Sequence, residues 1–193
     1  MTTTRERIID AAARLMLNKG YAATTVDEIV ADAGVAKGSV YHFFDSKEAV
    51  GLAALEAYFR RGGEIIMRGP FTTVDDPVKR AFALVDHVQA VSGQLWQHGC
   101  LAGNFAVEME AVSPAIRDAI ARWFATFETW LATFFQPIAE AAGAPDVPTG
   151  VELAAQLLAV IEGGIVMGRA RGDDTRLSAA IGEFRRYLVS LLN

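Results

Sequence analysis

Apolar residues recur every three or four positions along almost the whole chain, and no segment alternates convincingly between apolar and polar residues. The first spacing is typical of helices with one buried face, whereas alternation is typical of strands. The clearest run follows Ser113 and Pro114. Its apolar positions are Ile116, Ile120, Trp123, Phe127, Trp130, Phe134 and Ile138. The pattern predicts an all-α protein of about nine helices, and Pro137 is expected to end or kink this longest one.

The first fifty residues contain three short predicted helices separated by breaks. Thr25 and Glu28 have the spacing of a capping box, in which each side chain satisfies a free backbone N–H at the start of the second helix. Gly34 ends that helix, and the third helix buries Val40 and Phe44. Two helices joined by a tight glycine-containing turn are typical of a helix-turn-helix, whose second helix can enter the major groove of DNA.

The candidate DNA contacts lie on the third helix and at helix N-termini, where free N–H groups favour an anion. They are Thr24, Thr25, Lys37, Gly38, Ser39, Tyr41, His42 and Lys47. Small residues such as Gly38 and Ser39 allow close approach to the groove, whereas Tyr41 and His42 can donate to phosphate oxygens. Arg5 and Arg7 are expected to reach an adjacent groove or strand.

Charge limits how this segment could bind DNA. Residues 1–50 carry six basic and seven acidic side chains, and the whole chain of 193 residues has a formal net charge of -5. Strong non-specific binding relies on a basic surface. Recognition is therefore expected to depend on geometry and a few side chains. A compact three-helix unit without a ligand is the alternative interpretation.

The residues from Thr25 through Gly34 and Lys37-Gly38-Ser39 to Ser46-Lys47-Glu48 closely resemble the DNA-binding domain of the tetracycline-repressor (TetR) family of bacterial regulators. The resemblance covers roughly a quarter of the chain. It implies that Lys37, Ser39, Tyr41 and His42 belong to a recognition helix, and that Lys47 caps the next helix at a phosphate. Phe43 departs from the family, in which a His or Tyr is frequent at this position.

Two domains are expected. Residues 1–47 would form the three-helix DNA-binding domain, and residues 48–193 a helical ligand-binding and dimerisation domain. A long helix from Ser46 to Met67 would connect them. The last two predicted helices have two apolar faces each, which suits an interface with a second copy of the chain. Gly163, Gly164 and Gly168 indicate close approach of another backbone or a ligand, with packing inside one subunit as the alternative.

The aromatic-rich middle of the chain suggests an apolar pocket for a small-molecule inducer of unknown identity, which the family resemblance also implies. The predicted lining residues are Trp96, Cys100, Phe105, Met109, Trp123, Phe127, Trp130 and Met167. Each of them taken alone favours plain core packing. The polar residues that could orient a ligand are His87, Gln89, Asn104 and Glu108, although each is expected more often on the surface or satisfied inside the fold.

Cys100 is the only cysteine, so the chain has no intramolecular disulfide. Its expected place at a helix N-terminus near His98 would favour the thiolate and suits a sensor of oxidants or electrophiles. The alternative is a small buried apolar side chain. The low cysteine content and the absence of a signal-peptide pattern or membrane-spanning run predict a cytoplasmic protein without membrane contact.

No motif predicts a catalytic residue, a metal site or a cofactor. The sequence therefore predicts a ligand-responsive transcriptional regulator and not an enzyme. As a homodimer it would bind an inverted-repeat operator in double-stranded DNA, most simply as a repressor. The alternative is a helical-bundle enzyme, or a small-molecule-binding protein that does not bind DNA.

Overall fold

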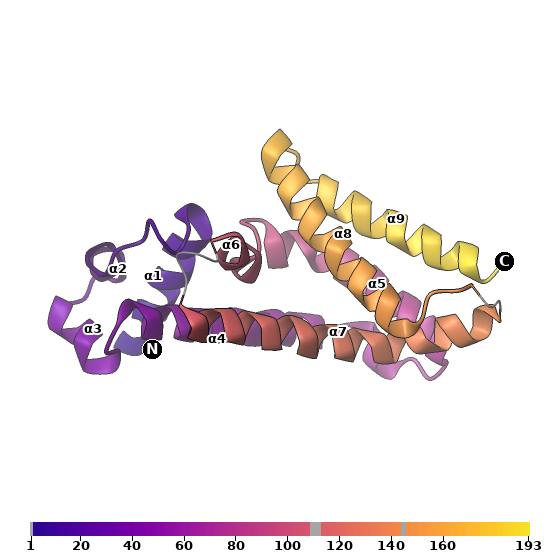
Figure 1. Ribbon diagram of the computed structural model, residues 1–193, viewed down its shortest axis with the longest axis horizontal. Coiled ribbons are helices and arrows are strands. Elements are labelled where there is room, and N and C mark those ends of the chain that lie inside the picture. Colours follow the sequence, from indigo (N-terminus) through magenta and orange to yellow (C-terminus); the bar gives the residue numbers. More distant parts are fainter. Residues whose placement is uncertain (1, 109–112, 144–145) are drawn as a thin grey trace. The chain divides into compact units, whose positions relative to one another are not determined.

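The computed structural model of the protein describes residues 2–108, 113–143 and 146–193. Within these residues the regular structure is helical, with no strand, which confirms the all-α prediction. Figure 1 shows the elements in chain order. They are α1 (Thr4–Lys19), α2 (Val26–Ala33), α3 (Lys37–Phe43), α4 (Lys47–Ile66), the 3-10 helix η1 (Pro70–Thr73), α5 (Pro77–Trp96), α6 (Leu101–Val107), α7 (Pro114–Ala142), α8 (Gly150–Arg171) and α9 (Arg176–Leu191).

The helices form two compact units. The first consists of Met1–Gly62 and His98–Arg122, and the second of Gly63–Gln97 and Trp123–Asn193. Helices α4 and α7 each contribute residues to both units. The functional boundary after residue 47 stays a prediction, because compactness and DNA-binding function need not divide at the same residue.

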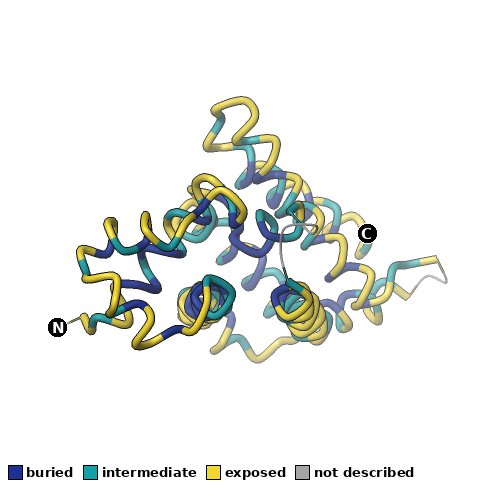
Figure 2. Tube along the Cα trace, turned by 60° about the vertical axis from the view of Figure 1, so that its left-hand side comes forward, coloured by how far each residue is buried: buried dark blue, intermediate teal, exposed yellow. Residues whose placement is uncertain are grey.

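The first unit is built around the buried stripe of α1. Figure 2 shows that helices of the fold carry a buried stripe beside exposed positions. Ile8 and Met16 of α1 are fully buried, as are Ile29 of α2 and Phe105 of α6. A capping box starts α1, because Thr3 accepts from the N–H of Glu6 while the Glu6 carboxylate accepts from the Thr3 N–H. This packed base holds α2 and α3 at the surface of the unit.

The second unit packs α8 along α9, and α9 against α5 (Figure 1). Asp76 caps α5 by accepting from the Lys79 N–H, and Pro77 occupies the first helical position, as the sequence predicts. The fully buried side chains come from several helices. They include Phe71, Leu84, Phe135, Ile138, Leu153, Leu157, Ile181 and Leu188.

Of the two effects expected of Pro137, it does not end its helix, since α7 continues to Ala142 with Pro137 inside it, and a kink stays a prediction. Proline removes one helical hydrogen bond. Phe135 and Ile138, on either side of it, are both fully buried in the core of the second unit. Burial of such large side chains contributes about 1.5–3 kcal/mol each, enough to offset one lost bond.

Two of the three singled-out glycines are explained by packing inside the chain. A Cβ atom at Gly164 would lie 2.9 Å from Leu177 Cδ1, and one at Gly168 would lie 2.9 Å from the Asp173 carbonyl oxygen. A Cβ at Gly163 would meet no atom of the described chain within 4 Å. The interpretation as local packing therefore holds for Gly164 and Gly168, and Gly163 is left without an internal reason.

Helix α8 is, among the described helices, the one long and apolar enough to cross a membrane by length and composition. Core helices of soluble proteins pass the same test. One face of α8 buries Leu153, Leu157 and Ile161 in the second unit. Packing within the second unit therefore explains the apolar residues on that face of α8. The apolar residues on its other face need a separate explanation.

Candidate nucleic-acid interface and apolar groove

The turn between α2 and α3 is fixed by backbone and side-chain hydrogen bonds. Gly34 adopts a left-handed conformation with φ 62° and ψ 44°, which glycine reaches without steric cost. The Val35 N–H donates to the Val30 carbonyl at 3.2 Å. Arg7 donates to the carbonyl oxygens of Ala33 at 2.5 Å and Gly34 at 2.8 Å. Arg7 therefore fixes the turn, a role that differs from the expected reach toward DNA.

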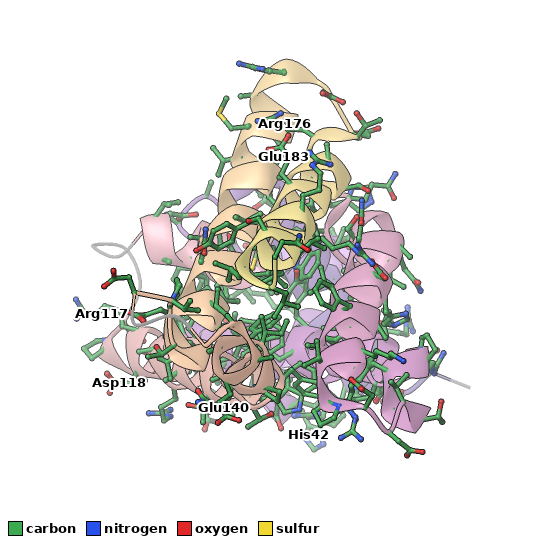
Figure 3. All side chains as sticks on the ribbon, turned by 90° about the vertical axis from the view of Figure 1, so that its right-hand side faces the viewer. His42, Arg117, Asp118, Glu140, Arg176 and Glu183 are labelled. Atoms are coloured by element: carbon green, nitrogen blue, oxygen red, sulfur yellow. The ribbon has the colours of Figure 1, made fainter. Side chains whose placement is uncertain are left out.

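Helix α3 buries Val40, leaves Ser39 half-buried and exposes its other residues. Val40 is buried, whereas Lys37, Gly38, Tyr41 and His42 are exposed (His42 is labelled in Figure 3). A Cβ at Gly38 would meet no atom of the described residues within 4 Å. The chain's own packing therefore does not require glycine there, and the outer face of α3 is flat at this point. This is the shape that a recognition helix needs at a groove floor.

Lys37 is paired across the turn. Its Nζ lies 2.6 Å from Asp27 Oδ1, and both side chains are exposed. The hydrogen bond to Asp27, followed by the charge of that carboxylate, raises the pKa of Lys37. Exposed pairs of this kind are weak, so a phosphate or a guanine edge could replace Asp27 at little cost.

The two threonines before α2 have different roles. Thr25 is exposed and forms the predicted capping box, accepting from the Glu28 N–H at 3.3 Å. A hydrogen bond from Lys19, followed by bonds from Thr25, lowers the pKa of Glu28 to about 2. Thr24 is fully buried, and its hydroxyl donates to the Gly20 carbonyl at 2.7 Å. Thr24 therefore supports the loop, whereas Thr25 is exposed at the surface.

Lys47 stands at the first position of α4, beside the loop that precedes α2. Its Nζ donates to the Ala22 carbonyl at 3.3 Å and lies 4.3 Å from the centre of the Tyr21 ring. Partial burial lowers the pKa of Lys47. Ser46 caps the helix by accepting from the Ala49 N–H at 3.1 Å. The ammonium group is thus held at a helix N-terminus, where a phosphate is also favoured.

Seven of the eight predicted DNA contacts therefore lie outside the core of one compact unit, on the start of α2, on α3 and on the start of α4. The eighth, Thr24, lies in its interior. The individual contacts stay predictions.

The second unit contains an apolar groove of about 270 Å³. Its lining residues are Gly63, Ile66, Met67, Trp123, Thr126, Phe127 and Trp130. Phe127 stacks on both tryptophans, with ring centres 5.1 Å from Trp123 and 5.7 Å from Trp130. The three rings form one continuous aromatic wall along α7. Three of the predicted ligand-binding residues are brought together here.

The other predicted pocket residues lie elsewhere. Trp96 lines a separate cavity of about 530 Å³ with residues of α5, α8 and the turn after α8. Met167 lines a third hollow, between α8 and α9. Cys100 and Phe105 are buried in the first unit. Met109 lies outside the described residues. Helical periodicity identified these side chains as apolar but could not assign them to one site.

The four polar candidates for ligand contact are all bonded within their own units. His87 Nε2 lies 3.1 Å from the Ile65 carbonyl oxygen, and the Gln89 amide donates to the Ser178 carbonyl at 3.0 Å. Asn104 and Glu108 hold the end of α1 and the loop after it. All four are half-buried and hydrogen-bonded, which agrees with the expectation of a surface or satisfied group. No local sequence signal indicated the contacts of Glu108, because its partners lie more than 80 residues away.

Cys100 is the N-terminal cap of α6, as expected, and its Sγ accepts from the Gly103 N–H at 3.4 Å. The residue is only 2% exposed. Burial restricts the access that a reactive thiol needs, so the structure favours the small buried side chain over the sensor.

Comparison with known proteins agrees with this architecture. Residues 8–54 match the family described as bacterial regulatory proteins, tetR family, and residues 77–183 match the C-terminal domain described as transcriptional regulator LmrA/YxaF-like. The protein is thus a helix-turn-helix transcriptional regulator. More narrowly, the chain belongs to the TetR family.

Relatives of known name support the same assignment. The chain is 34% identical to the HTH-type transcriptional repressor DhaR of Mycobacterium sp. (strain GP1), over 72% of this chain and 67% of that protein. It is 33% identical to the HTH-type transcriptional repressor NemR of Escherichia coli (strain K12), over 56% of this chain and 53% of that protein. A solved TetR regulator from Chloroflexus aurantiacus J-10-FL superposes with a TM-score of 0.82 at 28% identity, covering 96% of this chain and 94% of that one.

Proposed function

We propose that this regulator is a repressor that binds an inverted-repeat operator as a homodimer and releases it when a small molecule binds the C-terminal unit. The observation that carries the proposal is the outer face of α3, where Lys37, Gly38, Tyr41 and His42 are exposed while Val40 of the same helix is buried. The names of the relatives DhaR and NemR, both called repressors, support repression over activation. Such a regulator acts in the cytoplasm, where the DNA is.

Dimerisation is supported by the outer face of α8. Val151, Val166 and Met167 are exposed there, and Gly163 lies on the same helix, where a Cβ would meet no atom of residues 2–108, 113–143 and 146–193 within 4 Å. A glycine inside a helix costs about 0.8–1.0 kcal/mol relative to alanine. Close approach of a second copy would offset that cost. An operator with two-fold symmetry also requires two DNA-binding domains.

The dimer is tested by Val166→Asp, which places a charge at a site that is 62% exposed. In sedimentation velocity we expect the wild type to be a dimer and Val166→Asp to be a monomer, because a buried unpaired charge is strongly unfavourable. Val107→Asp is the matched control, since Val107 is 85% exposed on α6 in the other unit. If both variants have the same mass as the wild type, α8 is not the interface.

The lining of the aromatic groove favours a ligand that is flat, apolar and uncharged. Its wall consists of stacked rings, and its lining residues carry no charged side chain. The uncharged probe N-phenyl-1-naphthylamine is expected to bind and to quench tryptophan fluorescence. Phe127→Ala should abolish this quenching, whereas Phe82→Ala, another half-buried phenylalanine of the second unit, should not. Equal quenching in both variants would place the ligand site elsewhere.

DNA binding is tested by a titration at fixed salt on the DNA upstream of the protein's own gene, repeated with a scrambled duplex. We expect tighter binding to the upstream duplex, with the preference abolished by Tyr41→Ala on α3. Equal affinity for both duplexes would contradict an operator there. Turnover of a small molecule without DNA binding would favour the helical-bundle enzyme.

A further inference from the structure

The carboxylate of Glu108 holds the loop that leads into the DNA-reading helices. Its two oxygens accept hydrogen bonds from the backbone N–H groups of Tyr21, at 3.0 Å, and Ala22, at 2.8 Å. Glu108 is the C-terminal cap of α6, whereas Tyr21 and Ala22 belong to the loop between α1 and α2. All three residues lie in the first compact unit. Two adjacent N–H groups on one carboxylate form a strong, directional anchor.

The loop is shaped to receive this carboxylate. Gly20 has φ +90°, a conformation that side chains rarely adopt, and a Cβ atom there would lie 2.2 Å from Glu108 Oε1. The neighbouring face of α6 adds two contacts. The Asn104 amide donates to the Leu17 carbonyl at 2.7 Å, and the Phe105 ring meets the Tyr21 ring edge-on at 5.3 Å. The end of α6 therefore contacts the end of α1 and the following loop through hydrogen bonds and a ring contact.

The same loop carries the candidate phosphate contacts. The Ala22 N–H donates to Glu108, and the Ala22 carbonyl oxygen accepts from Lys47 Nζ. Lys47 also lies over the Tyr21 ring. Thr25, the cap of α2, follows three residues later. A shift of the loop would thus move the cap of α2 and remove the two groups that hold the Lys47 ammonium.

We propose that Glu108 is a positioning residue for DNA binding, one that locks the loop between α1 and α2 so that Lys47 and the start of α2 face the phosphate backbone. The proposal rests on the proposed DNA-binding function.

Electrostatics alone makes the opposite prediction. A carboxylate near the DNA-binding surface repels phosphate, so replacing it with a neutral amide should strengthen DNA binding. A glutamine at 108 keeps the size of the side chain but offers only one carbonyl oxygen, and its NH2 group faces a backbone donor. The sign of the change in DNA affinity therefore separates the two explanations.

The test compares Glu108→Gln with Glu56→Gln, which removes the same charge from an exposed position on α4 in the same unit. Affinity is measured at fixed salt on a duplex that the wild type binds. We expect Glu108→Gln to bind about three- to tenfold more weakly, tenfold corresponding to about 1.4 kcal/mol. Glu56→Gln should bind equally or slightly more tightly. Hydrogen exchange should accelerate at the amides of Tyr21 and Ala22 only in Glu108→Gln.

Two results would contradict the proposed positioning role of Glu108. Glu108→Gln could bind as tightly as Glu56→Gln, or the two loop amides could exchange at the wild-type rate. Gly20→Ala supplies a second variant, since its Cβ displaces the carboxylate. Combined with Glu108→Gln, it should reduce affinity by less than the product of the separate effects, because both remove one anchor. If the wild type binds no duplex, the proposed function fails, while the exchange measurement still decides whether Glu108 locks the loop.

Discussion

Replacing Lys47 with alanine tests whether the start of α4 contacts a phosphate. The ammonium group is held 3.3 Å from the Ala22 carbonyl oxygen and 4.3 Å from the centre of the Tyr21 ring. Two roles are compatible with this geometry. Lys47 either binds DNA from a prearranged position or only stabilises the loop between α1 and α2. The two roles differ in how DNA affinity depends on salt.

The size of the effect follows from counterion release. Each phosphate neutralised by a lysine contributes about -0.9 to the slope of log affinity against log salt. Lys47→Ala should therefore make the slope shallower by about 0.9. Between about 50 mM and about 200 mM salt, the affinity of the variant should fall by a factor about 3.5 times smaller than that of the wild type. Loss of the contact with the Tyr21 ring should also reduce stability by about 0.5–1 kcal/mol.

The assay is a series of fluorescence-anisotropy titrations at increasing salt, accompanied by urea unfolding. Lys79→Ala serves as the control, because it removes the same charge from an exposed position on α5 in the second unit. We expect the control to retain the wild-type slope. A Lys47→Ala variant that loses stability but keeps the full slope would show that Lys47 is purely structural, and the reasoning about its phosphate contact would be refuted.

Three further predictions concern helices α2 and α3 and the turn between them. Gly34→Ala should lower the free energy of unfolding by about 1–2 kcal/mol in urea, because an L residue is strained at φ 62°; an unchanged midpoint would contradict this. Gly38→Ala should raise stability by up to about 1 kcal/mol, since its Cβ would meet no atom of the described part of the chain within 4 Å, yet weaken DNA binding by obstructing the groove contact. Unaltered DNA affinity would remove Gly38 from the interface. Glu28, whose pKa is lowered from 4.5 to about 2, stabilises the fold above its unfolded pKa, and this contribution is lost as the pH falls through about 2. The stability difference between the wild type and Glu28→Gln should therefore shrink from pH 5 toward about pH 2 in urea unfolding; a constant difference would mean that the Glu28 charge has no role.

Local signals in the sequence determined most of the secondary structure. The capping box of Thr25 and Glu28, the stop at Gly34 and the start at Asp76-Pro77 all appear in the structure where the sequence predicts them. Their hydrogen bonds join residues at most four or five positions apart, so the residues that decide them are neighbours in the sequence. Pro137 shows the limit, because burial of the residues around it overrides a local helix-breaking preference.

Tertiary structure alone decided the roles of individual side chains. Thr24 and Thr25 are adjacent and identical, but packing buries one and exposes the other. Trp96 and Trp130 both satisfy a helical apolar pattern, yet they line different hollows. Arg7 reaches the turn at Gly34, and Glu108 reaches the loop at Tyr21, across 27 and 87 positions respectively. A periodic sequence specifies which face of a helix is buried, but it does not specify the partner, because the partner depends on how distant helices pack together. The sequence thus determined that this chain carries a DNA-reading motif, and only the packed fold decided which residues hold that motif in place.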